Sequence, residues 1–298
     1  MHSSSPIILY DREQGQTCEE KVMSRDWVDF LYQHPLGRLL EHHVLSTPWV
    51  SKVGGYLKAQ QGPQSIQAFI QDYSINTEEM AEPVSHYARF GDFFTRRLKA
   101  EARPLPLNPQ RLISPADGRL LCYPITQHQY IPVKGARYPL STLLENRSLA
   151  QQFENGYVLI YRLAPVDYHR YCYIDAGSHG PHVRLKGKLH SVNPVAIDTQ
   201  EPIFARNYRE YTLLKTHHFG PVLHMEVGAL MVGKVVQHHQ DSYDFQRGEE
   251  KGYFEFGGST IIQLFMKDRI VPDADILGHS AQGIECLVKY GSGVGQAQ

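Results

Sequence analysis

Apolar side chains in the first ninety residues recur at the spacing of helices. Pro35 lies inside this series and has no amide hydrogen to donate, so the helix should split or kink near His34. A second helix is expected over residues 65–70, entered through Gly62 and Pro63. The apolar face of the first series comprises Trp27, Phe30, Leu31, Leu36, Leu39, Leu40 and Val44. We therefore expect residues 1–90 to form a helical region.

Beyond about residue 110 the pattern changes to short runs of β-branched and aromatic residues separated by Gly, Pro, Asp and Asn. No helical pattern lies between these runs, as a parallel α/β sheet would require. The sequence therefore predicts an α+β fold, in which the helical region precedes a mostly antiparallel β sandwich or barrel-like domain over residues 91–298. The runs span residues 156–165, 167–174, 221–237, 252–265 and 285–291.

Charge and cysteine content narrow the classes of protein that fit. The 298 residues include 30 Lys and Arg against 31 Asp and Glu, so the net charge of -1 disfavours a nucleic-acid partner. The four cysteines lie far apart, which indicates neither a disulfide framework nor a zinc ribbon and favours a reducing, cytoplasmic location. No run reaches the ~18 to 20 apolar residues of a spanning helix. We expect any membrane contact to be made from one side.

A pair of glycines lies in an unusual place, between two apolar runs. The segment 257–260 reads Gly-Gly-Ser-Thr, and glycine permits backbone angles that other residues avoid. A β-bulge or tight turn would explain it. The alternative is a strained peptide bond at Gly258, with its carbonyl carbon open to attack by the hydroxyl of Ser259.

Two further segments contain residue types that carry chemistry. Residues 114–118, Ser-Pro-Ala-Asp-Gly, have the composition of a turn. In residues 163–170, strand alternation would place Asp167 and His169 on the same face. Taken alone, a single strand histidine is more often a hydrogen-bonded structural residue than a catalyst.

These motifs belong to a longer series of blocks that is spread over about two thirds of the chain, from residue 93 to residue 291. The blocks are residues 93–99 with 102–105, 114–118, 163–170, 227–233, 251–260, and 283–285 with 288–291. In content and order, they resemble the phosphatidylserine decarboxylase family. One short motif can match a family by chance, but accidental agreement of so many blocks in the same order is implausible.

The resemblance implies a lyase, made as a zymogen, that cuts itself between Gly258 and Ser259. Ser259 would become a covalent pyruvoyl group, the cofactor that forms a Schiff base with the substrate amine and accepts the electrons released by decarboxylation. The implied reaction converts phosphatidylserine to phosphatidylethanolamine and CO2. In the family pattern, Asp117 orients the base of the self-cleavage, and a histidine of residues 167–170 or their neighbourhood acts as base or later as proton donor.

One position departs from the family pattern, which usually reads D-Y-H-R-x-H. His169 matches the first histidine, but Cys172 stands where the second belongs. In the family, the second histidine is generally assigned as the base of self-cleavage. Either this chain lacks the base and its maturation is slow or absent, or a histidine elsewhere in the chain replaces it. His190 is our candidate, because Cys172 and His190 are equidistant from Pro181, nine residues on either side, and would be cross-strand neighbours in a hairpin. We then expect His169 to protonate the decarboxylated carbanion.

Two other classes of protein are alternatives to this enzyme. A non-catalytic, uncleaved lipid-binding homologue would keep the headgroup pocket, and a pyridoxal phosphate enzyme is disfavoured by the missing doubly wound pattern. The adjacent histidines at 42–43, 217–218 and 238–239 predict no metal site, because neighbours on a regular element point apart. The basic cluster of Arg96, Arg97, Lys99 and Arg103 is either a solvated face or a contact for headgroup phosphates.

A two-chain phospholipid does not readily leave the bilayer, so its enzyme must reach the surface. We assign docking to residues 25–60. The expected apolar contacts are Trp27, Phe30, Leu31, Leu36, Leu39, Leu40 and Trp49, and the alternative is that these side chains pack on the β domain. This implies a peripheral protein on the cytoplasmic face of the cell membrane. The small and large chains are expected to stay associated, while a homodimer and the acyl-chain preference are left open.

Overall fold

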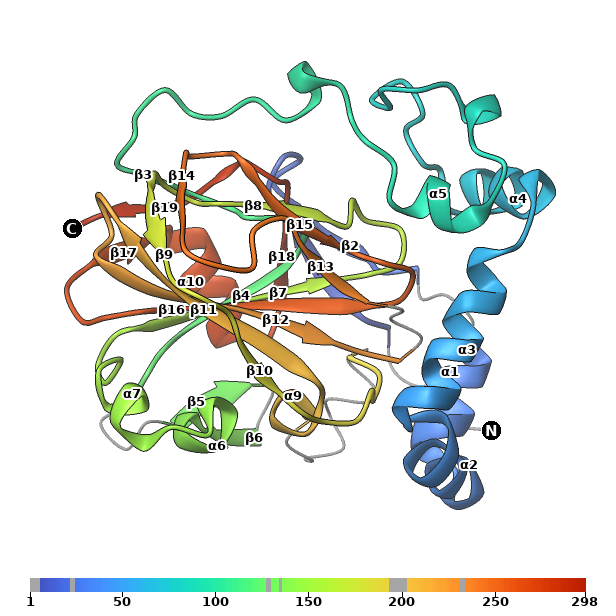
Figure 1. Cartoon of the computed structure of the whole chain (residues 1–298), viewed down its shortest axis with the longest axis horizontal. Coiled ribbons are helices and arrows are strands. Elements are labelled where there is room, and N and C mark those ends of the chain that lie inside the picture. The colour runs from blue at the N-terminus through green and yellow to red at the C-terminus, as the bar shows by residue number, and fades with distance from the viewer. Residues whose placement is uncertain (1–5, 22–24, 127–129, 134–135, 193–202, 231–233) are drawn as a thin grey trace.

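The computed structural model describes residues 6–21, 25–126, 130–133, 136–192, 203–230 and 234–298. Its largest element is an eleven-stranded sheet with the order β14-β9-β11-β12-β16-β7-β4-β18-β1-β2, and β10 also pairs with β11 (Figure 1). Neighbouring strands are antiparallel except β1 and β18. The strands are β1 (Ile8–Asp11), β2 (Gln16–Glu19), β4 (Gly118–Pro124), β7 (Tyr157–Leu163), β9 (Gly177–His179), β10 (Val183–Leu185), β11 (Arg209–Thr216), β12 (Pro221–Gly228), β14 (Tyr243–Phe245), β16 (Ser259–Phe265) and β18 (Glu285–Val288).

Smaller sheets accompany the large one. One apolar cluster joins the large sheet to β8 and β15, with Tyr161 and Ile261 packed among Tyr171 and Phe254. The predicted α+β class with a mostly antiparallel sheet is confirmed, and the described strands form no closed barrel. The smaller sheets contain β13 (Val235–Gln237), β15 (Glu250–Phe254) and β8 (Arg170–Cys172); β17 (Ile270–Pro272), β19 (Gly293–Ala297) and β3 (Arg111–Ile113); and β5 (Tyr130–Val133) with β6 (Ala136–Pro139).

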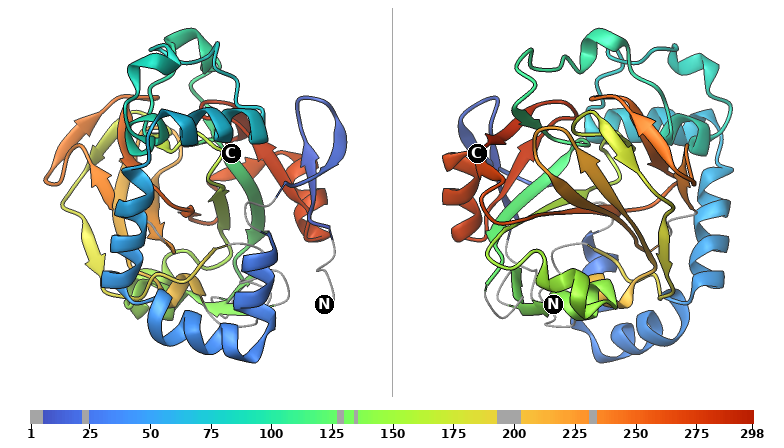
Figure 2. Two further views of the ribbon diagram at one scale, coloured as in Figure 1. Left: turned by 90° about the vertical axis from the view of Figure 1, so that its right-hand side faces the viewer. Right: turned by 60° about the vertical axis from the view of Figure 1, so that its left-hand side comes forward.

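Helices α1 to α4 follow one another around one end of the β structure (Figure 2). The predicted break at Pro35 is confirmed: the His34 side chain caps α2 by accepting a hydrogen bond from the Leu36 amide. The predicted start of α4 after Gly62 is also confirmed. The helices are α1 (Arg25–Gln33), α2 (Pro35–Leu40), a π-helical turn η1 (Glu41–Leu45), α3 (Pro48–Ala59), α4 (Pro63–Tyr73), η2 (Val84–His86), α5 (Phe90–Phe94), η3 (Ala100–Ala102), α6 (Leu140–Leu144), α7 (Arg147–Gln151), α9 (Ile203–Arg206) and α10 (Ala274–Ala281).

The first twenty residues differ from the expected helical region. Strands β1 and β2 form a hairpin, which turns at Gly15 with a positive φ of 66°. β1 then pairs in parallel with β18, near the other end of the chain. The edge offered by β18 decides the conformation of this segment, because a hairpin gains little stability until it joins a larger sheet. The division into domains at residue 90 stays a prediction.

An aromatic cluster connects helices α4 and α5 to the β structure. The rings of Phe90 and Phe94 in α5 lie 5.4 and 5.0 Å from the ring of Phe256. Phe69 of α4 packs edge-on against Phe90. Each such aromatic pair adds about 0.5–1.5 kcal/mol beyond the burial of its area. The cluster thereby fixes the chain just before Gly257.

Candidate active site

Ser259 is the first residue of β16, near the middle of the large sheet. It pairs with Gly228 of β12 on one side and Leu163 of β7 on the other, and it is fully buried. Gly257 has a φ of 139°, a conformation that side-chain-bearing residues rarely adopt. Aromatic packing on one side and two-sided strand pairing on the other therefore hold the peptide bond between Gly258 and Ser259.

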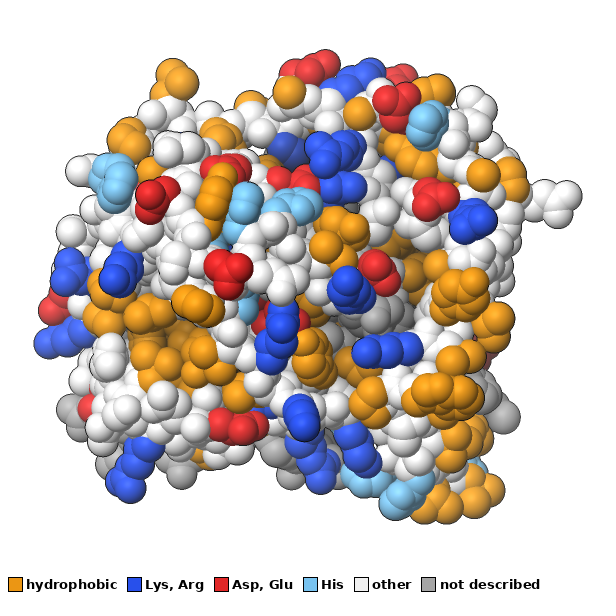
Figure 3. All heavy atoms as spheres, in the orientation of Figure 1, with side chains coloured by type: hydrophobic (Ala, Val, Ile, Leu, Met, Phe, Trp, Pro, Cys, Tyr) orange, Lys and Arg blue, Asp and Glu red, His pale blue; other side chains and the backbone are white. Residues whose placement is uncertain are grey.

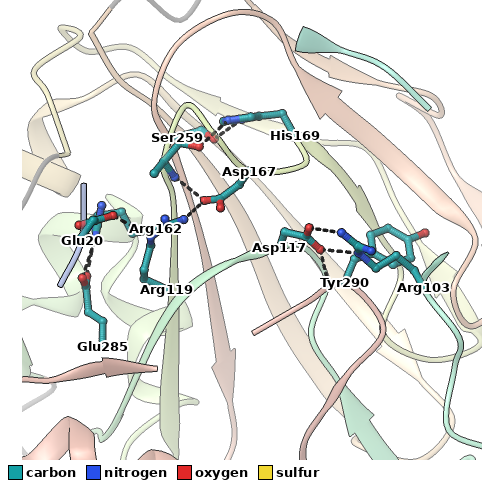
Figure 4. Close-up of polar contacts among 11 residues, drawn as sticks. Glu20, Arg103, Asp117, Arg119, Arg162, Asp167, His169, Ser259, Glu285 and Tyr290 are labelled. Atoms are coloured by element: carbon teal, nitrogen blue, oxygen red, sulfur yellow. Dashed lines mark hydrogen bonds and ion pairs between the residues drawn. The ribbon is translucent and has the colours of Figure 1, made fainter. Parts of the chain in front are cut away.

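His169 approaches Ser259 from the segment between β7 and β8, and the two side chains face each other in Figure 4. The Oγ atom of Ser259 lies 3.4 Å from the Nδ1 atom of His169. The other ring nitrogen, Nε2, lies 3.0 Å from the carbonyl oxygen of Ala164. Because a carbonyl only accepts, Nε2 must donate, and in a neutral ring Nδ1 is left as an acceptor for the serine hydroxyl.

The surroundings of His169 keep its ring uncharged. The ring is fully buried and stacks on Phe94 at 4.2 Å, with Phe254 edge-on at 6.5 Å. Burial lowers the pKa of His169 to about 3; the bond to Ala164 opposes this change, and the positive charge of Arg96 adds to it. His169 is therefore neutral at physiological pH, and the lone pair of Nδ1 is free to accept a hydrogen bond from the Ser259 hydroxyl.

The segment before His169 is a turn, where a strand was expected. The Asp167 amide donates to the Ala164 carbonyl at 2.9 Å, and the Ala164 amide donates to the Asp167 carboxylate at 2.6 Å. Asp167 and His169 consequently share no strand face, and β8 begins only at Arg170. Asp167 instead fixes Ala164, whose carbonyl oxygen in turn fixes His169.

A buried network of charges supports this turn (Figure 4). Asp167 pairs with Arg119 of β4, which also lies 2.8 Å from Glu20, the residue after β2. Glu20 lies 2.7 Å from Arg162 of β7, and Arg162 lies 2.6 Å from Glu285 of β18. Burial raises the pKa of Asp167, although the Arg119 charge opposes it. Sequence analysis missed this network, since it joins segments at both ends of the chain.

Asp117 lies in the predicted turn, which connects β3 to β4, but its partner is not a histidine. Its carboxylate accepts two hydrogen bonds from Arg103, at 2.9 and 2.6 Å, and one from the Tyr290 amide at 2.7 Å. Arg103 also pairs with Glu79 at 2.9 Å. The expectation that Asp117 orients His190 toward Ser259 is not supported by these contacts.

The predicted contact between Cys172 and His190 is wrong. β8 pairs with β15, which places Cys172 opposite Glu250, whereas the chain after it forms β9 and β10, which pair with β11. Burial raises the pKa of Cys172 to about 12, so the thiol stays protonated at physiological pH and supplies no thiolate to act as a base. The Nδ1 atom of His190 lies 2.9 Å from the Glu41 carboxylate, and the His190 backbone amide donates a hydrogen bond to the Oδ1 atom of Asn207 at 2.9 Å.

The surface of α2 and α3 exposes large apolar side chains, which gather at the lower right of Figure 3. Among the proposed docking residues, Leu31 is buried and Leu40 packs partly into the core, so neither belongs to this surface. The Trp27 side chain lies outside the described part of the structure. We call the following exposed set the apolar face: Phe30, Leu36, Leu39, Val44, Trp49, Val53, Tyr56 and Leu57.

The described residues contain no group of three or more His, Cys, Asp or Glu side chains placed to hold a metal ion. None of the helices within the described ranges is long and apolar enough to cross a membrane.

Comparison with known proteins adds independent evidence. Residues 90–296 match the profile of the family described as phosphatidylserine decarboxylase. A phosphatidylserine decarboxylase proenzyme from Clostridium novyi is 39% identical over 291 residues, which cover 97% of this chain and 99% of that protein. The proenzyme from Clostridium beijerinckii is 35% identical, and proenzyme 2 from Clostridium acetobutylicum is 38% identical, each over 97% of this chain and 98% of its own length.

Proposed function

Because the chain belongs to the phosphatidylserine decarboxylase family, we propose that it converts phosphatidylserine to phosphatidylethanolamine and CO2 with a pyruvoyl group made from its own Ser259. One observation carries the proposal: the Ser259 hydroxyl lies against a neutral imidazole, directly after Gly257 and Gly258. A nucleophile and a base within hydrogen-bond reach are the minimum that self-cleavage requires.

The residues support self-cleavage in the following order. His169 accepts the Ser259 proton at Nδ1 while Oγ attacks the Gly258 carbonyl carbon. His169 then passes this proton to the nitrogen of residue 259 as the amide bond between residues 258 and 259 breaks, which leaves an ester to Gly258 and a free amine on residue 259. Removal of the Ser259 α-proton then expels the Gly258 carboxylate and leaves dehydroalanine. One water molecule hydrolyses its enamine end, releases ammonia and leaves the keto group of the pyruvoyl.

The residues around position 259 also suit the later reaction. The pyruvoyl group would supply the electron sink for the pair of electrons left when CO2 departs. His169 would remain beside this position, and its low pKa means that a proton held at Nδ1 is readily given up. Phe94 and Phe254 shield the ring from water.

The departure at Cys172 does not remove the base in this scheme. We assign the base of self-cleavage to His169, whose Nδ1 faces Ser259, in place of His190, whose Nδ1 bonds to Glu41. Asp167, through Ala164, takes the orienting role that Asp117 was expected to have. In this scheme Asp117 has a structural role, because its ion pair with Arg103 holds the loop of Arg103 beside the site.

The proposed cut would leave two interleaved chains. Residues 259–298 contribute β16 between β12 and β7, and β18 between β4 and β1. Backbone hydrogen bonds on both sides of each strand favour continued association of the two chains.

We infer that the enzyme works as a peripheral protein at the cytoplasmic face of the membrane. The apolar face presents Trp49 and Leu36 at 75% and 66% exposure, which is costly in water and favourable at a lipid interface. This position would bring the site to the phospholipid.

Mass spectrometry and a decarboxylation assay on the same preparation test the function. The enzyme should yield two chains, with residues 259–298 carrying a carbonyl in place of the terminal amine, and should release CO2 from phosphatidylserine. A single full-length chain that binds phosphatidylserine vesicles without turnover would instead identify an uncleaved lipid-binding homologue.

A further inference from the structure

Arg96 is a buried guanidinium without a carboxylate partner. It follows α5, is 6% exposed, and has no ion pair within 4 Å among the described residues. Within the described part of the chain, its only side-chain hydrogen bond runs from Nη1 to the Phe93 carbonyl oxygen at 3.5 Å, the outer limit for such a bond. Its Nε atom has no partner, although the Phe93 ring lies 4.9 Å from the guanidinium carbon.

A buried, unpaired charge lowers the stability of the fold, so we expect it to persist only where the charge has a function. Burial lowers the pKa of Arg96, which reflects the cost of keeping the cation away from water. Buried arginines elsewhere in the chain behave differently, since Arg162 has two carboxylate partners, Glu20 and Glu285. An unpaired buried cation is exceptional and calls for a functional explanation.

The Arg96 side chain lines a cavity of about 220 Å³ beside the site. At ~30 Å³ per water molecule, this is room for about seven waters. Its wall includes the turn residues 166–168, directly before His169, and Arg96 is close enough to lower the pKa of that ring. The other charged groups on the wall are Glu79, Arg103, Asp117 and Asp167.

The charges on the wall leave the positive charge of Arg96 unmatched at contact distance. Arg103 pairs with both Glu79 and Asp117, and Asp167 pairs with Arg119 outside the cavity. An anion that enters can therefore reach a cation that no protein carboxylate already holds. A guanidinium with free N–H groups matches the oxygens of a phosphate ester in geometry as well as charge.

We propose that Arg96 and this cavity bind the phosphodiester of the substrate headgroup. The assignment rests on the proposed function and names the group that holds the substrate next to Ser259. Arg96 acts in binding and orientation, while His169 remains the group that moves protons.

The reaction itself favours the phosphate over the serine carboxylate as the partner. The carboxylate loses its charge as CO2 leaves, so a guanidinium bound to it would stabilise the substrate more than the transition state. The phosphate keeps its charge throughout, and binding it stabilises both states equally. Loss of Arg96 should then raise KM and leave kcat nearly unchanged.

Calorimetric titration of the purified protein tests binding without relying on turnover. The probes are glycerol 3-phosphate, inorganic phosphate and lactate, and the proteins are wild type, Arg96→Gln and Arg97→Gln. Arg97 is the matched control, because its side chain is 68% exposed and sits one residue away. We expect wild type and Arg97→Gln to bind glycerol 3-phosphate, and Arg96→Gln to bind it at least tenfold more weakly.

The other probes can overturn the assignment. Arg96-dependent binding of lactate without binding of glycerol 3-phosphate would make this a carboxylate site. Tighter binding of inorganic phosphate than of glycerol 3-phosphate would make it a site for free phosphate. Equal binding by wild type and Arg96→Gln would exclude Arg96 altogether. These results hold whether or not the protein decarboxylates lipid, so failure of the proposed function is seen separately in the CO2 assay.

Thermal unfolding separates a binding role from a structural one. Replacing an unpaired buried charge with a neutral side chain should leave Tm unchanged or raise it. We therefore expect Arg96→Gln to be at least as stable as wild type while binding the phosphate ester poorly. A large fall in Tm together with the lost binding would show that Arg96 supports the fold and would overturn the proposal.

Discussion

Ser259 and His169 lie 90 residues apart in the chain, yet Oγ and Nδ1 are 3.4 Å from each other in the folded, uncut protein. The hydroxyl and the imidazole therefore meet before any cleavage. Folding assembles this pair, and the bond that the pair is proposed to break lies directly N-terminal to Ser259.

Ser259→Ala should remain one intact chain, because it lacks the attacking oxygen. Wild type should convert with time to two chains that separate in denaturing electrophoresis. Intact mass measured at intervals after refolding checks both. Cleavage of the alanine variant at the same bond would exclude Ser259 as the nucleophile.

His169→Gln should slow self-cleavage by about a hundredfold or more, the usual contribution of a positioned general base. His190→Gln and Cys172→Ser should cleave at rates near wild type, since neither side chain is hydrogen-bonded to Ser259. Quantifying the chain of residues 259–298 over time gives the three rates. A block in His190→Gln with cleavage preserved in His169→Gln would return the base role to His190.

Asp167→Asn should destabilise the fold by about 3 kcal/mol, as expected when one partner of a buried ion pair loses its charge. It should also slow cleavage, because Ala164 and His169 would be held less firmly. Urea unfolding of the uncut Ser259→Ala background gives the stability. The exposed pair Lys289–Glu13 provides the control, and Lys289→Met should change stability by less than about 1 kcal/mol. Equal effects of the two changes would contradict the role of the network.

The low pKa of His169 predicts a specific dependence of stability on pH. Between its unfolded value of ~6.5 and its folded value of about 3, the unfolded chain binds one more proton at this residue, so stability falls as pH falls. Well inside that window the contribution approaches ~1.4 kcal/mol per pH unit. Ser259→Ala/His169→Gln should show a slope smaller by this amount than Ser259→Ala, in urea unfolding at pH 4 to 6. Identical slopes would mean that His169 is not buried as a neutral ring.

The apolar face should be needed at the membrane and dispensable for folding. Replacing Leu36, Leu39 and Trp49 together with glutamine should greatly reduce sedimentation with phosphatidylserine vesicles, since burial of each such side chain contributes about 1.5–3 kcal/mol. Leu107→Gln is the control, because Leu107 is fully exposed elsewhere on the surface. Turnover of a short-chain, water-soluble substrate should persist in the triple variant. Unchanged vesicle binding would show that another surface makes the contact.

Local signals in the sequence were reliable where one residue decides the backbone. Pro35 ends a helix whatever its surroundings, and Gly62 with Pro63 begins one, so both predictions are confirmed. The turn at residues 114–117 is also a local property. The motif containing Ser259 could be found by resemblance because its residues are consecutive.

Features that depend on distant pairing could not be predicted in this way. The first strand forms because β18 offers it an edge, and the register of Cys172 depends on β15, about eighty residues further along. The hairpin centred on Pro181 was plausible from symmetry alone, but the large sheet takes up β9 and β10 instead. The carboxylate partners of Arg119 and Arg162, and the burial of Arg96, likewise depend on the complete fold.

The central position of β16 has a consequence for the lifetime of the mature protein. A continuous chain can unfold and refold, but once Ser259 is cut from Gly258, refolding requires two separate molecules to find each other. The new end lies between β12 and β7, so reassembly would also have to reopen the large sheet. After cleavage, a molecule that unfolds would therefore not readily regain its folded state. Its persistence would be set by the rate at which it unfolds, and an unfolded copy would be replaced by synthesis of a new chain.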